Sequence, residues 1–275
     1  MSLFNKSING FIWSFLNSIG MQLINFIVQI ILARILSPEV FGTMAIIQVF
    51  LTIGLYLMDG GMGSSLIRMK NPTQDDYSTV FYTNVFFGVI IFGAIWFIAP
   101  YVATFYSLPD LTILIRVISS SFLIRSFAAT QMAILTKEMD FKKLALIQLP
   151  SILISGVIGV ITANFGYGIW SLVILNIAQA LIFTISFWLQ SKWRPSFVFK
   201  KKLFKYHFNF GFKISLTNVV NGVFDNIYNM VIGKTYNVLF LSYYNRAETV
   251  SNAPRKDIVQ YLRKGYISNV FRDSE

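Results

Sequence analysis

Long apolar segments separated by short polar loops dominate this 275-residue sequence. The hydrocarbon core of a bilayer is about 30 Å thick and a helix rises about 1.5 Å per residue, so roughly 20 apolar residues cross it. Segments of that kind lie at about 11–34, 40–60, 79–99, 111–135, 144–164, 168–190 and 209–232. Because backbone polar groups inside lipid must be satisfied within their own segment, each is predicted to be helical. The sequence therefore predicts an all-α, polytopic membrane helical bundle.

The composition supports the membrane class and excludes several kinds of site. Only 13% of the residues are charged, whereas soluble domains carry about 25%. The absence of cysteine excludes disulfides, thiol catalysis and cysteine metal sites, and the single histidine, His207, argues against a multi-histidine metal site. We find no catalytic constellation and no cofactor motif. The sequence therefore predicts neither an enzyme nor a metal centre.

The placement of the basic residues predicts an orientation and argues against nucleic acid as the partner of a chain with net charge +11. With the N-terminus inside, the outside loops hold only Arg34 and Lys234, each at a helix end. The inside loops hold twelve cations: Lys6, Arg68, Lys70, Lys137, Lys142, Lys143, Lys192, Arg194, Lys200, Lys201, Lys202 and Lys205. Cytoplasmic loops carry such an excess, so we expect a cytoplasmic N-terminus.

Residues 209–234 resemble a second copy of residues 8–34. Polar positions align with polar ones, and a small residue before a cation ends each copy: Ser18 with Asn218, Asn25 with Asp225, Gln29 with Asn229, and Ala33-Arg34 with Gly233-Lys234. A helical membrane protein that begins to repeat after six helices is typical of a two-lobed transporter.

The repeat and the charges divide the chain into four regions. Residues 1–190 are predicted to form a first six-helix lobe, residues 191–208 a basic cytoplasmic linker, and residues 209–245 the start of a second lobe. The linker fits either an ordinary inside loop or an interfacial helix on anionic lipid. Residues 246–275 form a polar, atypical tail, which favours a truncated or frame-shifted C-terminus over a natural short form.

Polar side chains inside the predicted spans are the candidate site. Gln22, Asn25 and Gln29 share one face of the first helix with Ser18. Such a face lines a hydrophilic cavity or makes hydrogen bonds between helices. Arg125 lies near the middle of its segment, where an arginine costs about 2.5–3.5 kcal/mol on insertion scales, so it needs a substrate, water or a carboxylate partner.

Three further charged residues lie at or inside predicted spans. Arg116 is on the opposite face of the same helix as Arg125 and within two turns of its outer end. Asp59 ends the second span and Asp225 lies within the seventh. An intramembrane carboxylate is an ion-coupling site or the partner of an arginine, and both interpretations stay open here.

Several short runs resemble the signatures of a known transporter family. They are residues 32–42 (LARILSPEVFG), 59–68 (DGGMGSSLIR), 99–100 (AP), 105–106 (FY), 141–142 (FK), 193–195 (WRP), 210–211 (FG), 232–234 (IGK) and 243–247 (YYNRA). Together they are similar, in order over about 1–250, to the Wzx-type O-antigen and exopolysaccharide flippases of the multidrug/oligosaccharidyl-lipid/polysaccharide exporter superfamily.

This resemblance implies two six-helix lobes that alternate access and carry undecaprenyl-pyrophosphate-linked oligosaccharide to the outer leaflet. It also implies a cationic cavity for the pyrophosphate and an ion gradient as the energy source. The candidates in this chain are Arg34, Arg116, Arg125 and Lys234. The implied partners are the lipid-linked oligosaccharide, the bilayer and glycan polymerase or assembly proteins, and no nucleic acid.

Three other functions compete with this interpretation. A small-molecule cation antiporter of the same fold would favour carboxylates and aromatics over arginines at its site. A membrane glycan polymerase or ligase would need catalytic groups on a substantial outside loop, and every predicted outside loop is short. An inactive remnant of a flippase would fit the polar tail.

Overall fold

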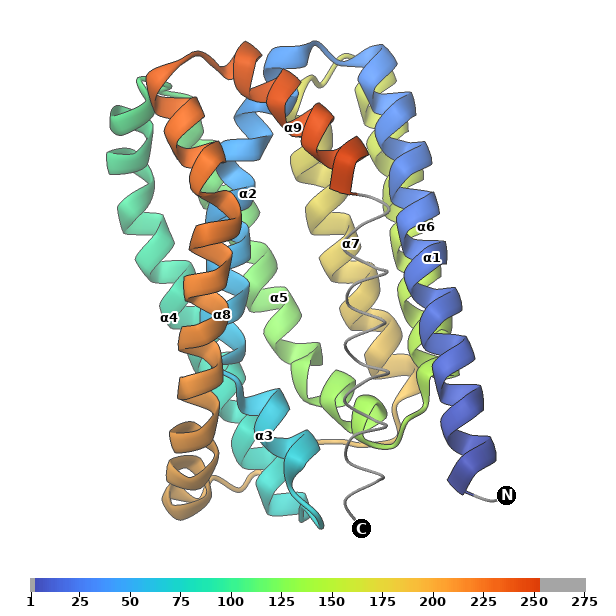
Figure 1. Cartoon of the computed structure of the whole chain (residues 1–275). Coiled ribbons are helices and arrows are strands. Elements are labelled where there is room, and N and C mark those ends of the chain that lie inside the picture. Colours follow the sequence, from blue (N-terminus) through green and yellow to red (C-terminus); the bar gives the residue numbers. More distant parts are fainter. Residues whose placement is uncertain (1–2, 253–275) are drawn as a thin grey trace.

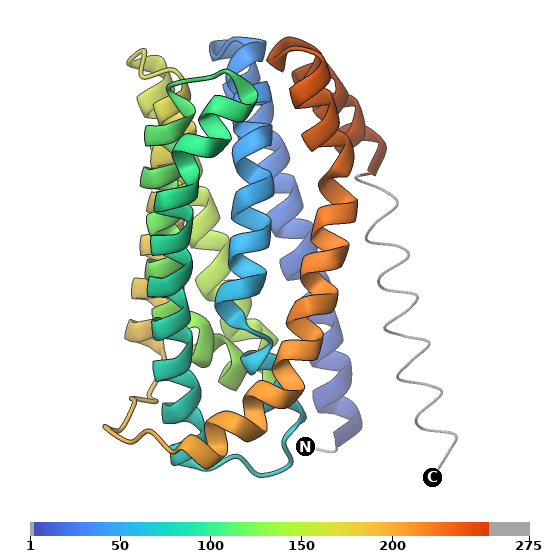
Figure 2. The ribbon, with the colours of Figure 1, turned by 90° about the vertical axis from the view of Figure 1, so that its left-hand side faces the viewer.

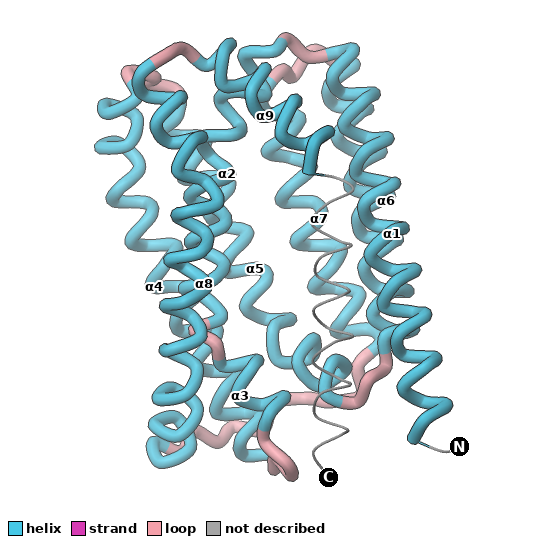
Figure 3. The backbone as a smooth tube through the Cα atoms, viewed as in Figure 1, coloured by secondary structure: helices cyan, strands magenta, loops and turns pink. Residues whose placement is uncertain are grey.

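The computed structural model describes residues 3–252, and every regular element within them is a helix (Figures 1 and 3). The helices are α1 (Leu3–Ile35), α2 (Pro38–Asp59), α3 (Met62–Arg68), α4 (Gln74–Tyr106), α5 (Leu111–Lys137), α6 (Phe141–Asn164), α7 (Ile169–Gln190), α8 (Lys201–Thr235) and α9 (Val238–Asn252). The predicted all-α polytopic bundle is confirmed. Most of the predicted tail, residues 253–275, lies outside the described residues.

Six of these helices are long and apolar enough to cross a membrane: Ile12–Ile35 of α1, and α2, α4, α5, α6 and α7. They coincide with the first six predicted segments. The seventh predicted segment, 209–232, lies within α8, which has 35 residues but is too polar to join this group. The protein is therefore a multi-pass membrane protein whose eighth helix depends on its neighbours more than the others do.

The helices pack as a series of neighbours. α8 and α9 pack on α2, α2 on α5, α5 on α7, α7 on α6, and α6 on α1, while α4 covers α5. Figure 1 shows α8 and α1 on opposite sides of the view with α5 and α7 between them, and Figure 2 shows α8 and α9 along one edge. The largest buried cluster lies among α2, α4, α5 and α7, where Phe122 packs directly against Gly54.

Three boundaries differ from the predicted ones. The predicted span 79–99 ended before Pro100, but that residue lies inside α4, which continues to Tyr106. Residues 201–208, expected in the linker, are the first turns of α8, because nothing after Pro195 interrupts a helix there. The connection after the second span contains the seven-residue helix α3. Glycines end the second span: Gly60 and Gly61 have φ of 54° and 67°, which favours glycine.

The basic loops lie at one end of the bundle. The turns after α3, α5 and α7 share this end, and we call it the basic end (lower end in Figure 1). The opposite end carries the turns after α1, α4, α6 and α8. Arg34 and Lys234 lie at helix ends there, and Arg246 of α9 lies over the Phe41 ring at the start of α2. A capping box at Thr73 begins α4 at the basic end, which explains why α4 starts five residues before the predicted span.

Candidate functional site

Arg125 lies near the middle of α5, against an aromatic ring. Its guanidinium carbon is 5.4 Å from the ring centroid of Phe183 on α7. Among the side chains that the structure describes, it has no hydrogen-bond acceptor and no carboxylate partner, and it is half-buried. A cation at this depth is unfavourable unless water, an anion or a ring compensates it. The ring of Phe183 supplies part of that compensation.

The neighbours of α5 show which way Arg125 faces. Phe122 packs on Gly54 of α2, and Ser126 lies against Gly88 of α4. On a third side, the carbonyl of Ile124 accepts a hydrogen bond from Thr184 of α7 at 3.0 Å. Because successive helical residues turn by about 100°, Arg125 lies between the α2 side and the α7 side, away from α4.

The polar face of α1 lies beside its contact with α6. The contact itself uses Asn17, which donates to Gln148 at 2.7 Å, and Gly20, which lies against Leu149. Asn25 and Gln29 are exposed, whereas Gln22 is half-buried and interacts with another residue. Two polar side chains of a membrane-spanning helix are thus left open, although lipid is a poor environment for them.

Asp225 occupies an exposed position on α8. The side of α8 that faces α2 buries Gly222 and Asn229, and the α4 side is marked by Tyr106, whose hydroxyl donates to the carbonyl of Met230 at 3.4 Å. Asp225 is turned by about 140° from Met230, so it faces away from α4. In the described part of the chain no cation pairs with it.

The other candidates lie elsewhere. On α5, Arg116 stacks on Trp96 at 4.8 Å and donates to its carbonyl at 3.2 Å. Lys234 donates to the carbonyl of Phe105 at 2.5 Å, at the C-terminal end of α4. Arg34 is exposed at the end of α1. The structure therefore places these three cations toward the end opposite the basic end and does not bring them to Arg125.

Asp59 ends α2 beside the start of α3. One oxygen of its carboxylate would lie 3.2 Å from a Cβ built on Gly63, so the side chain faces the first turn of α3. A carboxylate is favourable there, because the N–H groups of a first helical turn have no partner within the helix. No ion pair joins Asp59 to a cation in residues 3–252.

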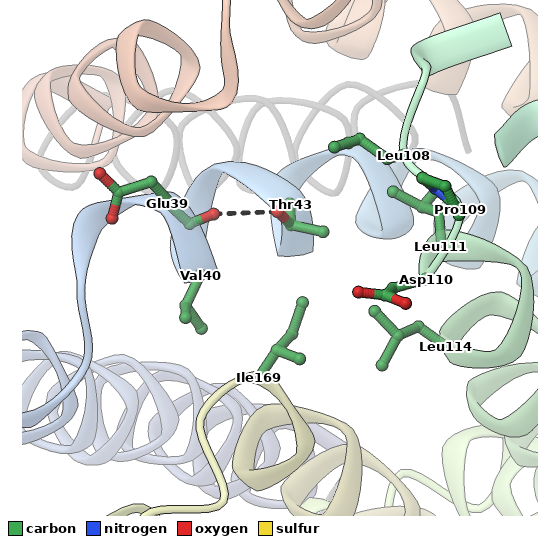
Figure 4. A pocket seen from close by; sticks show the side chains of 9 residues that line it. All are labelled: Glu39, Val40, Thr43, Leu108, Pro109, Asp110, Leu111, Leu114 and Ile169. Carbon is green, nitrogen blue, oxygen red and sulfur yellow. Dashed lines mark hydrogen bonds between the residues drawn. The ribbon is translucent and has the colours of Figure 1, made fainter. Parts of the chain in front are cut away.

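A pocket of about 230 Å³ opens at the end opposite the basic end, between α2, the α4–α5 turn and α7. Glu39 and Asp110 are among its residues, but Figure 4 shows the Glu39 carboxylate pointing away from Asp110. The dashed line there is the Thr43 hydroxyl donating to the Glu39 carbonyl at 3.0 Å. No cluster of three metal-ligating side chains occurs among the described residues. The pocket therefore offers no convergent polar site.

Sequence reasoning missed a buried network around His207. This residue served only to argue against a metal site, yet its ring bridges Ser65 of α3 and Asp76 of α4. The available signal was the row of small or polar residues on α8 at spacings of four and seven, which marks one helix face: His207, Gly211, Ser215, Gly222, Asn229 and Gly233.

Comparison with known proteins now decides the family. Residues 31–270 match the family described as "Polysaccharide biosynthesis protein". The chain belongs to this family. The resemblance to the Wzx-type flippases drawn from the sequence runs is thereby confirmed.

Two relatives of this chain have names that refer to polysaccharide biosynthesis, and one of these also refers to transport. It is 31% identical over 72% of its length to the succinoglycan biosynthesis transport protein ExoT of Rhizobium meliloti. It is 23% identical over 92% to the lipopolysaccharide biosynthesis protein WzxC of Escherichia coli, and 26% identical over 93% to a membrane protein in the cps region of Klebsiella pneumoniae. These matches cover 41%, 52% and 54% of the relatives, so the chain spans about half their length. No solved structure matches the chain.

Proposed function

We propose that this protein takes part in flipping undecaprenyl-pyrophosphate-linked oligosaccharide to the outer leaflet during surface polysaccharide biosynthesis. It acts as a transporter and not as an enzyme. The family and the transport-related name of ExoT support this proposal. The mechanism is a rocking of two lobes about a site near the bilayer midplane, the arrangement common in transporters with internal repeats. Glycan polymerase or assembly proteins are the expected partners, and nucleic acid is not.

The observation that carries the proposal is the unpaired guanidinium of Arg125. It is half-buried near the middle of a membrane-spanning helix, and no acceptor within residues 3–252 neutralises it. A pyrophosphate supplies a double negative charge and acceptor oxygens that suit the planar donor fork of arginine. An anionic lipid-linked substrate therefore satisfies the one charged group of α5 that the described protein leaves open.

Two exposed polar faces complete the proposed path. Asn25 and Gln29 lie on α1, and Asn221 and Asp225 on α8, at the two ends of the series of packed helices that contains α5. Glycan hydroxyls need hydrogen-bond partners of this kind. We infer that both faces border the substrate path, with the glycan against them and the pyrophosphate at Arg125.

The proposed orientation follows from the basic end. With that end in the cytoplasm of a bacterial inner membrane, the basic loops obey the positive-inside rule. The N-terminus is then cytoplasmic, since α1 begins at the basic end (Figure 1). The substrate enters from this side.

One alternative has an observation in its favour. Asp225 is exposed and unpaired in the described part, which suits a small-molecule cation antiporter. Such a site, however, leaves Arg125 without an anion. A transport assay on this chain separates the two functions.

The test is flipping of a fluorescent polyprenyl-pyrophosphate oligosaccharide by the purified chain in liposomes. Arg125→Ala removes charge-assisted contacts worth about 1.5–3 kcal/mol, so flipping should fall about 10- to 100-fold at equal protein incorporation. Arg125→Lys should retain part of the rate. The matched control is Arg116→Ala on the same helix, which loses a Trp96 contact and should slow flipping less than about threefold. Wild-type flipping by Arg125→Ala would show that this arginine does not hold the anion.

A further inference from the structure

A buried polar network joins three helices at the basic end. Ser65 Oγ lies 2.8 Å from Nδ1 of His207, and Nε2 of the same ring lies 3.1 Å from Oδ1 of Asp76. The second oxygen of Asp76 accepts from the hydroxyl and the N–H of Thr73 at 2.6 and 2.8 Å. Ser65, Asp76 and His207 are 3%, 1% and 0% exposed. The network therefore holds the start of α8 against α3 and α4.

The series of serine, histidine and aspartate does not make a hydrolytic site here. In such sites the serine binds Nε2 and the carboxylate binds Nδ1, and the hydroxyl is open to the substrate. In this protein Ser65 bonds to Nδ1 of His207 and Asp76 bonds to Nε2, and Ser65 is 3% exposed. A substrate carbonyl has no access to that hydroxyl, so the network serves to connect helices.

The fully buried part of the remaining α8 contact consists of small groups, while the partly buried rings of Phe204 and Phe208 pack beside it on the apolar cluster around Met62 and Leu66. Gly211 meets the α2–α3 turn through its backbone, since a Cβ built on Gly61 would lie 2.1 Å from the Gly211 carbonyl oxygen. One turn further on, Ser215 donates to the carbonyl of Tyr56 at 2.9 Å. The six buried residues of α8 include no large apolar side chain. By contrast, the α5 and α7 contacts bury Phe122 and Phe187 completely.

The fully buried part of this contact tolerates water when the helices separate. Two helix faces that part into an aqueous space expose whatever they had buried, and large apolar side chains resist that exposure. Glycine, serine, asparagine and histidine are exposed to water at little cost. Within residues 3–252, the only side-chain-to-side-chain hydrogen bonds from α8 to α2, α3, α4, α5, α6 or α7 are those of His207. Opening at the basic end must break them.

We propose that Ser65, Asp76 and His207 form the gate that closes the basic end between α8 and the preceding helices. Each opening separates His207 from Asp76 and Ser65, and each closure reforms both contacts. The structure shows the closed state of this end. The inference rests on the two-lobe rocking of the proposed function, and it assigns positioning roles to three residues outside the substrate path.

The first test measures opening without measuring transport. The sequence has no cysteine, so a single Ser215→Cys reports solvent access by its rate of modification with a charged thiol reagent in liposomes. Ser215 is 4% exposed and lies eight residues beyond His207, outside the space that removal of the ring would vacate. The matched reporter is Ser171→Cys, which is 0% exposed and lies at the other end, on α7.

Adding His207→Ala should raise the modification rate at residue 215 about tenfold or more and change the rate at residue 171 less than twofold. Asp76→Asn, a milder change, should give the same pattern to a smaller degree. Equal rises at both reporters would mean a general loss of packing, and no rise at 215 would mean that the network does not control access. Either result overturns the gate.

The second test locks the gate. In Ser65→Cys/His207→Cys, bridging with a short, reducible bifunctional thiol reagent should stop flipping, and reduction should restore it. Full flipping by the bridged protein would also overturn the gate. If the unaltered chain flips no substrate while the residue 215 rate responds to His207→Ala, the gate stands and the proposed function fails.

Discussion

Replacing Gly61 by alanine tests the closest approach in the protein, that of the α2–α3 turn to α8. A Cβ at Gly61 would lie 2.1 Å from the carbonyl oxygen of Gly211, whereas ordinary contact begins at 3.4 Å, so the two backbones must part by about 1.3 Å. The contact is between two backbones, and no flexible side chain can move aside. Gly61 also has a φ of 67°, which L residues adopt with strain.

Two terms give the size of the effect. The left-handed conformation costs an alanine about 1–2 kcal/mol, and overpacking costs about 1–3 kcal/mol. The free energy of unfolding should therefore fall by about 2–5 kcal/mol. Gly211→Ala is also destabilised by overpacking, because its Cβ would lie 2.6 Å from the Gly60 carbonyl oxygen. Alanine is, however, favoured over glycine in a helix by about 1 kcal/mol. The free energy of unfolding should therefore fall less for Gly211→Ala than for Gly61→Ala.

The measurement is reversible unfolding in mixed micelles, followed by tryptophan fluorescence. Gly93→Ala is the matched control, because it is a glycine inside α4 with nothing within 4 Å of a built Cβ. Its alanine should be neutral or stabilise by up to about 1 kcal/mol. The expected order of stability is Gly93→Ala, then Gly211→Ala, then Gly61→Ala. Equal stabilities of the Gly61 and Gly93 variants would refute the close approach.

Two further changes probe other contacts between helices. Lys234→Met removes a cation and its hydrogen bond to the Phe105 carbonyl at the C-terminal end of α4. The free energy of unfolding in the same assay should therefore fall by about 0.3–1 kcal/mol at low salt, and by less at high salt. Gly54→Ala places a Cβ 2.4 Å from the Phe122 ring and should destabilise by about 1–3 kcal/mol, and adding Phe122→Leu should recover part of that loss. Additive losses in this double-mutant cycle would show that the two residues do not touch.

Hydrophobic length predicted the six spanning helices well because that signal is local. Each span needs about 20 apolar residues whatever its neighbours are, and the composition of α2, α4, α5, α6 and α7 shows this directly. The glycine turn after the second span is equally local, since φ values of 54° and 67° favour Gly60 and Gly61. Helix ends were less predictable. The predicted span 79–99 stopped just before Pro100, but the helix continues past it to Tyr106.

The partners of polar residues could not be predicted from the sequence. Arg125 was identified from its depth, but whether a carboxylate reaches it depends on how α5 and α8 are placed. His207 meets residues 142 and 131 positions away, a pairing that no spacing rule reveals. The same limit explains Arg116, whose ring partner on α4 became known only from the packed structure.

The small-residue face of α8 also bears on how the chain enters the membrane. The six apolar helices can each partition from the translocon on their own hydrophobicity, but α8 lacks that property. Its retention in the bilayer then depends on α2 being already in place to receive Gly211, Ser215 and Gly222. Insertion into the membrane thus has an order, in which α2 must be in place before α8 can pack against it. A change on the receiving face of α2 would appear first as a topology defect of newly made protein.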